Sequence, residues 1–203
     1  MANTFDKPLV TILDTRTLED PAAFQEAYAK VAPSRQKKVN NCRFPKDKRL
    51  CLGAGLLFVQ ELQKLGIFDA QIAYADSGKP YIANHPEVFF NLSHSGQYAA
   101  CAFYHKEIGI DVQQIVPVSD PLIQKIAVQE EAATILQLSQ EAKEEAFAKL
   151  WTIKESYLKY IGSGLRVSPK RLTYFDGLFL DGTPVNVTLE TTQLPGHIMT
   201  LCY

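Results

Sequence analysis

Two carboxylates stand in segments that otherwise favour apolar side chains. Asp111 lies within 108–113 (IGIDVQ), a run of strong strand formers in which aspartate is uncommon. Glu155 lies within 144–162 (EEAFAKLWTIKESYLKYIG), where helical spacing places it on the apolar stripe or at its border. An ionised carboxylate on an apolar surface is costly unless a cation pairs with it or a metal ion binds it. Both residues are therefore candidates for chemistry.

Each carboxylate also has an interpretation that involves no chemistry. Asp111 can be a solvent-facing residue of a half-exposed strand. Glu155 can form an exposed ion pair with Lys159, four residues on, which contributes only a few tenths of a kcal/mol. For either residue alone, both interpretations stay open.

The two carboxylates together favour a metal site. Alternate residues of a strand share a face, so Gly109, Asp111 and Gln113 lie on one side of their segment. Two carboxylates from separate elements, with oxygen-rich neighbours and no His/Cys cluster, are typical of sites for a hard cation. Magnesium binds one or two carboxylates, keeps several waters and usually completes its shell with phosphate oxygens of a substrate. The sequence therefore predicts Mg²⁺ beside a phosphorylated substrate.

Two further segments offer groups that bind phosphate. In 91–96 (NLSHSG), the Ser93 hydroxyl, the His94 imidazole and turn N–H groups can surround an anion, although His94 alone is more simply a hydrogen-bonded turn residue. The segment 35–49 holds seven basic residues and one acidic residue. A charge run is usually a solvated face, but in a chain with net charge -1 this clustering also suggests a phosphate site. The chain has no P-loop, GxGxxG or Ser-His-Asp arrangement.

The composition is that of an ordinary globular protein. Of its 203 residues, 46% are hydrophobic and 21% are charged, which excludes a disordered chain. The near-zero net charge argues against general nucleic-acid binding, and the longest apolar run, 50–59, is too short to span a bilayer. The first 16 residues lack a sustained apolar run, so we expect no signal peptide. Four cysteines without a CxxC pair are expected to be reduced, as in a cytoplasmic protein.

Helices and strands must position these side chains. Apolar patterning predicts a strand at 8–13, a helix from Pro21 capped by Asp20, and a helix from Pro45 that ends at Gly66. The remaining expected elements are strands within 72–82, 88–104 and 108–115, helices at 121–138 and 143–161, and strands at 171–175, 178–180, 185–191 and 197–203. Helices followed by strands, twice over, predict an α+β protein of two similar halves.

Three motifs in this order resemble those of a known family. The segments FNLSHSG, IGIDVQQ and LWTIKESYLKYIGSGL are similar to those of the surfactin-synthetase type of 4′-phosphopantetheinyl transferase. Those enzymes carry an (I/V)G(I/V)D strand and, about forty residues later, a WxxKExxxK helix. Here Asp111 and Glu155 are 44 positions apart (155 minus 111). Upstream, FPKDKRLCLG and SGKPYI also stand in the family's order, so the resemblance covers roughly residues 30–175.

The resemblance implies a fold and a reaction. The fold is a pseudo-dimer of two α+β halves, here 1–103 with the basic segment and the SHSG loop, and 104–203 with the GID strand and the KESYLK helix. The reaction moves the 4′-phosphopantetheine group of coenzyme A to a serine of an apo acyl or peptidyl carrier protein. Adenosine 3′,5′-bisphosphate is released.

The resemblance also implies roles for single residues. Asp111 and Glu155 are expected to hold Mg²⁺ against the pyrophosphate, Glu155 to act as the general base, and Lys159 to support the developing charge. Many members carry a glutamate as a further metal ligand where this chain has Gln113, an amide that can still coordinate but adds no charge. The residues expected to bind coenzyme A are Arg35, Lys38 and Arg49 at the 3′-phosphate, Lys79 and Pro80 at the adenine, and Ser93 and His94 at further phosphates.

The expected partners are coenzyme A and an apo carrier protein. We expect no binding to nucleic acid or membrane, and we expect the enzyme to be a monomer. The segment 35–49 can serve coenzyme A, the carrier or both, and the carrier can belong to fatty-acid, polyketide, peptide or glycolipid synthesis. One alternative is a non-catalytic coenzyme A-binding protein or carrier-protein adaptor that keeps the fold, to which only Gln113 points. A generic Mg²⁺ phosphohydrolase has no matching motif.

Overall fold

The computed structural model describes residues 6–203, apart from the side chain of Leu165. We expect no signal peptide in the first 16 residues, and residues 1–5 of that stretch lie outside the described range. The described chain forms two compact units. The first runs through Ala75 and resumes at Pro80–Ile108, and the second combines Asp76–Lys79 with Gly109–Tyr203. Residues 104–108, assigned to the second half from the sequence, belong to the first unit because strand β5 extends to Tyr104.

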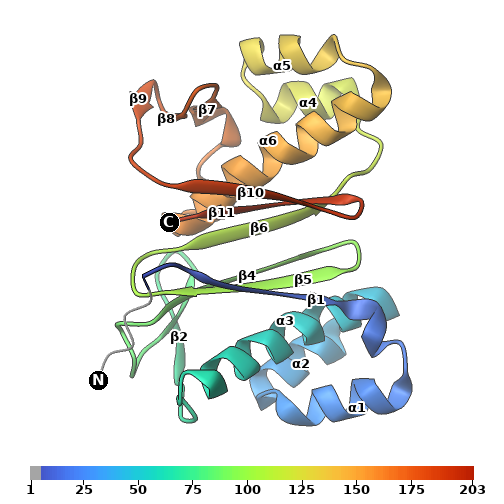
Figure 1. The fold of residues 1–203 in the computed structure, drawn as a ribbon, viewed down its shortest axis with the longest axis vertical. Helices are drawn as coiled ribbons and strands as arrows, with labels where there is room; N and C mark the ends of the chain where they lie inside the picture. Colours follow the sequence, from blue (N-terminus) through green and yellow to red (C-terminus); the bar gives the residue numbers. More distant parts are fainter. Residues whose placement is uncertain (1–5) are drawn as a thin grey trace. The chain divides into compact units, whose positions relative to one another are not determined.

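The first unit is a three-stranded antiparallel sheet covered by helices (Figure 1). The sheet has the order β1-β5-β4, and the long helix α3 packs on it, with α1 and α2 packed on α3. A two-stranded hairpin, β2-β3, follows α3. The elements of this unit are β1 (Leu9–Asp14), the 3-10 helix η1 (Thr15–Leu18), α1 (Pro21–Lys30), α2 (Pro33–Asn41), α3 (Pro45–Lys64), β2 (Ile72–Tyr74), β3 (Pro80–Ile82), β4 (Phe89–Ser95) and β5 (Tyr98–Tyr104).

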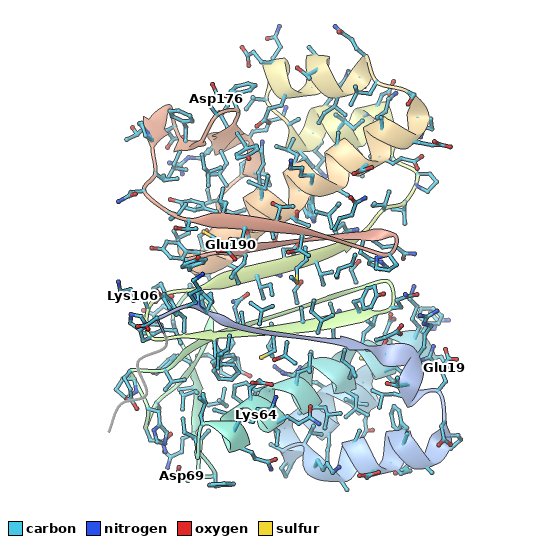
Figure 2. The ribbon with its side chains drawn as sticks, in the orientation of Figure 1. Glu19, Lys64, Asp69, Lys106, Asp176 and Glu190 are labelled. Atoms are coloured by element: carbon cyan, nitrogen blue, oxygen red, sulfur yellow. The ribbon has the colours of Figure 1, made fainter. Side chains whose placement is uncertain are left out.

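The second unit repeats this plan with different loops. Its antiparallel sheet has the order β10-β11-β6, and the long helix α6 packs on β6 and β11. In Figure 2, side chains fill the layer between α6 and these strands, and the labelled Glu190 lies on β10. The elements are β6 (Gly109–Gln114), α4 (Asp120–Ile126), α5 (Gln129–Leu136), α6 (Gln140–Tyr160), the 3-10 helices η2 (Gly164–Arg166) and η3 (Pro169–Arg171), β7 (Leu172–Tyr174), β8 (Leu178–Leu180), β9 (Thr183–Pro184), β10 (Leu189–Leu194) and β11 (His197–Cys202).

The predicted α+β class is confirmed, and so are most elements. The Asp20 carboxylate accepts from the Ala22 N–H and caps α1, and Gly66 follows α3 with a positive φ of 75°. Within the described residues, no helix is long and apolar enough to cross a membrane.

Three predictions about elements are wrong. The helix expected at 121–138 is two helices, because the chain is extended at Ala127 and Val128. The Ile126 carbonyl and the Val128 N–H, which a continuous helix would bond internally, are bonded instead by the side chains of Lys154 and Glu131. The strand expected at 185–191 begins only at Leu189. The basic stretch, for which a helix was predicted only from Pro45 onward, also contains α2.

Glycine at position 109 lets α6 approach β6 unusually closely. A Cβ at Gly109 would lie 2.0 Å from the Ser156 carbonyl oxygen and 2.5 Å from the Tyr160 nitrogen. Both are backbone atoms of α6, so no side-chain rotation can relieve the contact. The glycine of the IGID segment therefore sets the distance between the strand that carries Asp111 and the helix that carries Glu155.

Replacing this glycine is expected to damage the second unit. We predict that Gly109→Ala lowers the free energy of unfolding by about 3 kcal/mol or more, because one methyl group must push the two backbones apart. Gly177→Ala is the matched control, since a Cβ at that position meets only the end of the Phe179 ring at 3.9 Å. Urea unfolding of both variants measures the difference, and equal stabilities would show that α6 can move away from β6 freely.

Candidate functional site

The structure brings Asp111, Glu155 and Lys159 together between β6 and α6. Asp111 is 6% exposed and Glu155 is 9% exposed. The Lys159 ammonium lies 2.6 Å from Asp111 Oδ1 and donates a second hydrogen bond, of 3.0 Å, to the Ile110 carbonyl. The interpretation of Asp111 as a solvent-facing residue is therefore wrong, and Lys159 forms its close ion pair with Asp111.

Glu155 has a buried oxygen without a hydrogen bond. Its Oε1 atom is buried and has no hydrogen-bond partner within residues 6–203. Burial raises the pKa of Glu155, the nearby charge of Asp111 raises it further, and the Lys159 ammonium lowers it by a smaller effect. A buried acceptor of this kind is rare unless it serves a ligand or a proton transfer.

The donors present here fit a magnesium ion. The two buried carboxylates repel each other, and the unsatisfied Glu155 oxygen is a hard ligand of the type that Mg²⁺ prefers. Groups of three or more His, Cys, Asp or Glu side chains placed to hold a metal do not occur in the described part of the chain. A metal held here by the protein would therefore use Asp111 and Glu155, with an amide, water or substrate oxygen completing the shell.

Gln113, the third expected ligand, follows Asp111 on the same face of β6. Its side chain is half-buried, and its amide nitrogen donates a hydrogen bond of 3.3 Å to the Gln114 carbonyl. Its amide oxygen is an acceptor and is the atom of this side chain that can bind a cation.

Two of the expected phosphate-binding residues line a cavity of about 370 Å³ in the first unit. Arg35 packs against Gly55, where a Cβ would lie 2.6 Å from Arg35 Cγ, and its guanidinium lies 3.9 Å from Cys51 Sγ. The Lys38 ammonium donates a hydrogen bond of 3.0 Å to the Tyr74 hydroxyl. In Figure 2, the label Lys64 marks the last residue of α3 and the label Asp69 marks the chain just beyond it; the cavity is lined by residues next to both.

The other expected phosphate contacts in this unit lie elsewhere. Arg49, on α3, pairs with Glu19 at 3.0 Å and is not among the residues that line the cavity. Ser93 and His94 lie in strand β4, not in a loop, because their register with Ala100 and Ala99 of β5 continues to Ser95. They point to opposite faces, and Ser93 is buried whereas His94 is exposed. Because β4 is an edge strand, one ligand can reach both only around that edge.

Lys79 and Pro80 stand at the boundary between the units. The Lys79 ammonium donates a hydrogen bond of 2.8 Å to the Tyr160 carbonyl at the end of α6, where a cation is favourable. Arg166 anchors the same segment by donating to the Asp76 carbonyl at 2.9 Å. Pro80 begins strand β3 opposite Tyr74. The 76–79 segment is thus held against the carboxyl end of the helix that carries Glu155 and Lys159.

Comparison with known proteins decides the family. Residues 107–200 match the family model described as the 4′-phosphopantetheinyl transferase superfamily, and residues 19–106 match that of the 4′-phosphopantetheinyl transferase N-terminal region. The chain is 32% identical over 158 residues to the 4′-phosphopantetheinyl transferase HetI of Nostoc sp., covering 73% of this chain and 67% of that relative. The chain belongs to the 4′-phosphopantetheinyl transferase superfamily.

Two further relatives agree. The 4′-phosphopantetheinyl transferase Sfp of Bacillus subtilis is 28% identical over 173 residues, covering 84% of this chain and 76% of the relative. The L-aminoadipate-semialdehyde dehydrogenase-phosphopantetheinyl transferase of Rattus norvegicus is 27% identical over 175 residues, covering 77% and 56%. The resemblance found from the motifs is confirmed, and the protein is an enzyme of this transferase family.

Sequence reasoning missed two features around the transferase's α6. The Thr152 hydroxyl bonds the Thr200 hydroxyl at 2.8 Å, which ties α6 to β11. Lys154 is fully buried against Glu131, although the spacing of Leu150, Lys154 and Leu158 at four-residue intervals placed it on the apolar stripe. A lysine in that position was a signal equal to that of Glu155.

The raised pKa of Glu155 predicts how the stability of the metal-free transferase depends on pH. A carboxyl group whose pKa is raised in the folded state stabilises the fold below its ordinary pKa and loses this contribution as pH rises through the raised value. Glu155→Gln cannot ionise, so we expect it to unfold at a higher temperature than the unmodified protein at pH 7, in the presence of a chelator. The gain should vanish near the ordinary glutamate pKa of about 4.3.

Thermal unfolding as a function of pH measures this difference. Glu145→Gln, at an exposed position of α6, is the control and should change little at any pH. A variant at Glu155 that is less stable than the unmodified protein at pH 7 would mean that the ionised carboxylate has a cationic partner without any metal.

Proposed function

We propose that this enzyme transfers the 4′-phosphopantetheine group of coenzyme A to a serine hydroxyl of an apo acyl or peptidyl carrier protein, in a reaction that requires Mg²⁺ and releases adenosine 3′,5′-bisphosphate. The observation that carries the proposal is the cluster of Asp111, Glu155 and Lys159, in which a buried Glu155 oxygen has no hydrogen-bond partner among the described residues. The named activity of the relatives, phosphopantetheinyl transfer, supports it.

In the proposed step, the serine oxygen forms a bond to the phosphorus that carries the pantetheine arm. The bond from this phosphorus to the bridging oxygen breaks, and adenosine 3′,5′-bisphosphate leaves with that oxygen. Glu155 accepts the serine proton, directly or through water. Lys159 neutralises charge that develops on the pyrophosphate oxygens.

Asp111, Glu155 and the amide oxygen of Gln113 would hold the magnesium ion. When bound, Mg²⁺ supplies positive charge to the pyrophosphate and fixes its orientation. The Lys159–Asp111 ion pair orients the Asp111 side chain before the substrate enters.

The residues proposed to bind coenzyme A include two cations of the first unit. Arg35 and Lys38 are cations that line the cavity, which suits the 3′-phosphate and groups near it. The further proposed contacts are Arg49, Ser93, His94, Lys79 and Pro80. We propose accordingly that 1–103 grips coenzyme A and that 104–203 holds the metal. We further propose that the enzyme acts in the cytoplasm as a monomer, with a carrier protein as its macromolecular partner and neither nucleic acid nor membrane.

Transfer can be measured directly as a gain in carrier mass. Incubation with coenzyme A, Mg²⁺ and an apo carrier protein should raise the mass of the carrier by one phosphopantetheine. Glu155→Gln removes both a ligand and the base, and we predict that it lowers kcat at least about 100-fold. Glu145→Gln, exposed on the same helix, should transfer at the unmodified rate.

Several carrier proteins of different pathways should be tried in that assay. The absence of any mass gain across them, with folded protein and bound coenzyme A, would favour the non-catalytic binding protein. Full activity of Glu155→Gln would contradict the assignment of Glu155 as base and ligand.

Gln113 offers a gain-of-function test of the metal site. Because carboxylates bind Mg²⁺ more strongly than amides, Gln113→Glu should lower the Mg²⁺ concentration that gives half-maximal transfer by about tenfold. Gln114→Glu, on the opposite face of β6, is the matched control. An unchanged magnesium requirement in Gln113→Glu would show that this side chain does not face the metal.

A further inference from the structure

A second buried ion pair holds α6 to the helices α4 and α5. The Lys154 side chain is fully buried, and its ammonium lies 2.5 Å from Glu131 Oε2 and 3.3 Å from the Ile126 carbonyl oxygen. Glu131 is itself only 5% exposed. Lys154 immediately precedes Glu155 in the WxxKExxxK motif, and the transferase mechanism gives it no role.

Glu131 joins three separate segments of the second unit. Its Oε2 atom accepts from the Val128 N–H at 2.9 Å at the start of α5, and its Oε1 atom accepts from the Tyr174 N–H at 2.8 Å in β7. Lys154 of α6 is the third donor, so the Glu131 carboxylate accepts hydrogen bonds from the start of α5, from β7 and from α6. The pair is therefore part of a hydrogen-bonded polar network inside an apolar layer that includes Ile123, Ile135 and Leu150.

The stability of the fold does not explain this pair. Burying two charges costs about as much free energy as their attraction returns, and apolar residues of similar volume are often at least as stabilising. The contribution that a buried pair makes, and that an apolar contact does not, is a fixed geometry: an ammonium and a carboxylate bind in one register and one orientation.

We propose that Lys154 and Glu131 are positioning residues that fix the rotation of α6 about its axis, so that Glu155 points at Asp111. This inference rests on the proposed role of Glu155 in the transfer. Consecutive helical residues are rotated by about 100°, so anchoring one sets the direction of the next. The ion pair that joins α6 to β6, Lys159–Asp111, consists of reacting groups and cannot hold the helix independently of substrate.

A small rotation is enough to matter. With side chains, the helix has a radius of about 5–6 Å, so a turn of about 20° would move the Glu155 carboxylate by about 2 Å. Displacements of about 1 Å at a reacting group can cost about 100-fold in rate. The Thr152–Thr200 bond lies on the sheet side of α6. On the side of α4 and α5, the Lys154–Glu131 pair is buried, whereas the Lys143–Asp120 pair is half-exposed.

The test compares a broken pair with a neutral pair. Lys154→Met alone leaves a buried carboxylate without its cation and should unfold at a much lower temperature. Lys154→Met combined with Glu131→Gln removes both charges. The introduced amide can still accept from the Tyr174 N–H but no longer from the Val128 N–H, so the double variant should unfold at a temperature between those of Lys154→Met and the unmodified protein. Lys143→Met with Asp120→Asn removes a half-exposed pair between α6 and α4 and is the matched control.

Two readouts on the double variant separate positioning from stability. The first needs no ligand: Trp151, the one tryptophan of the chain, lies on α6 one turn before Glu155, and its emission maximum and quenching by acrylamide report a rotated helix. The second is the binding of Mn²⁺ in the presence of coenzyme A, measured by electron paramagnetic resonance. Loss of the Lys154–Glu131 pair should weaken the binding of Mn²⁺ by about 10- to 100-fold. The kcat should fall by a similar factor, with little change in KM for coenzyme A.

The outcomes are distinguishable. A folded double variant with altered Trp151 fluorescence and weakened Mn²⁺ binding supports the proposal, provided that the control pair changes neither. Normal fluorescence and normal Mn²⁺ binding in the double variant overturn it and leave Lys154 a purely structural residue. Failure of the unmodified protein to bind Mn²⁺ with coenzyme A would contradict the proposed function instead, while Trp151 still shows whether the ion pair sets the rotation of α6.

Discussion

The close contact between α6 and β6 is the constraint on which the site depends. A strand and a helix ordinarily meet through side chains, but here the Gly109 position brings the backbones so near that one methyl group would collide with Ser156. Lys159 then reaches the Ile110 carbonyl, and Thr152 reaches Thr200 on the neighbouring strand. At this spacing, the carboxylates of the strand and of the helix share one buried region, where charge interactions are strong because water is largely excluded.

Two buried glutamates on facing helices show what separates a structural carboxylate from a functional one. Glu131 accepts hydrogen bonds from three donors on three elements, so its burial costs little and it holds those elements in place. Glu155 has a buried oxygen with no partner in the described chain and faces a second negative charge. The fold tolerates this arrangement because apolar clusters on both sides of α6 stabilise the unit. An unsatisfied carboxylate of this kind is available to a cation or a proton.

The sequence predicted the fold class, most elements and the central residues, for physical reasons. Long amphipathic runs with proline at the first turn and glycine beyond the last are strong local signals, so α1, α3 and α6 were foreseen. Asp111 and Glu155 were found because charge in an apolar pattern is conspicuous. The break at Ala127 was not foreseen, because the freed Ile126 carbonyl is bonded by Lys154, which is distant in sequence. The strand conformation of Ser93 and His94 likewise follows from pairing with β5, which local turn signals could not reveal.

The central claim is that Asp111 and Glu155 bind one divalent ion beside the pyrophosphate of coenzyme A. The most direct measurement is anomalous X-ray diffraction from crystals grown with coenzyme A and Mn²⁺, collected at the manganese absorption edge. The account predicts one strong peak within bonding distance of a carboxylate oxygen of both residues and of a pyrophosphate oxygen. A peak at another place on the protein, or a pyrophosphate bound with no metal between these two carboxylates, would contradict it.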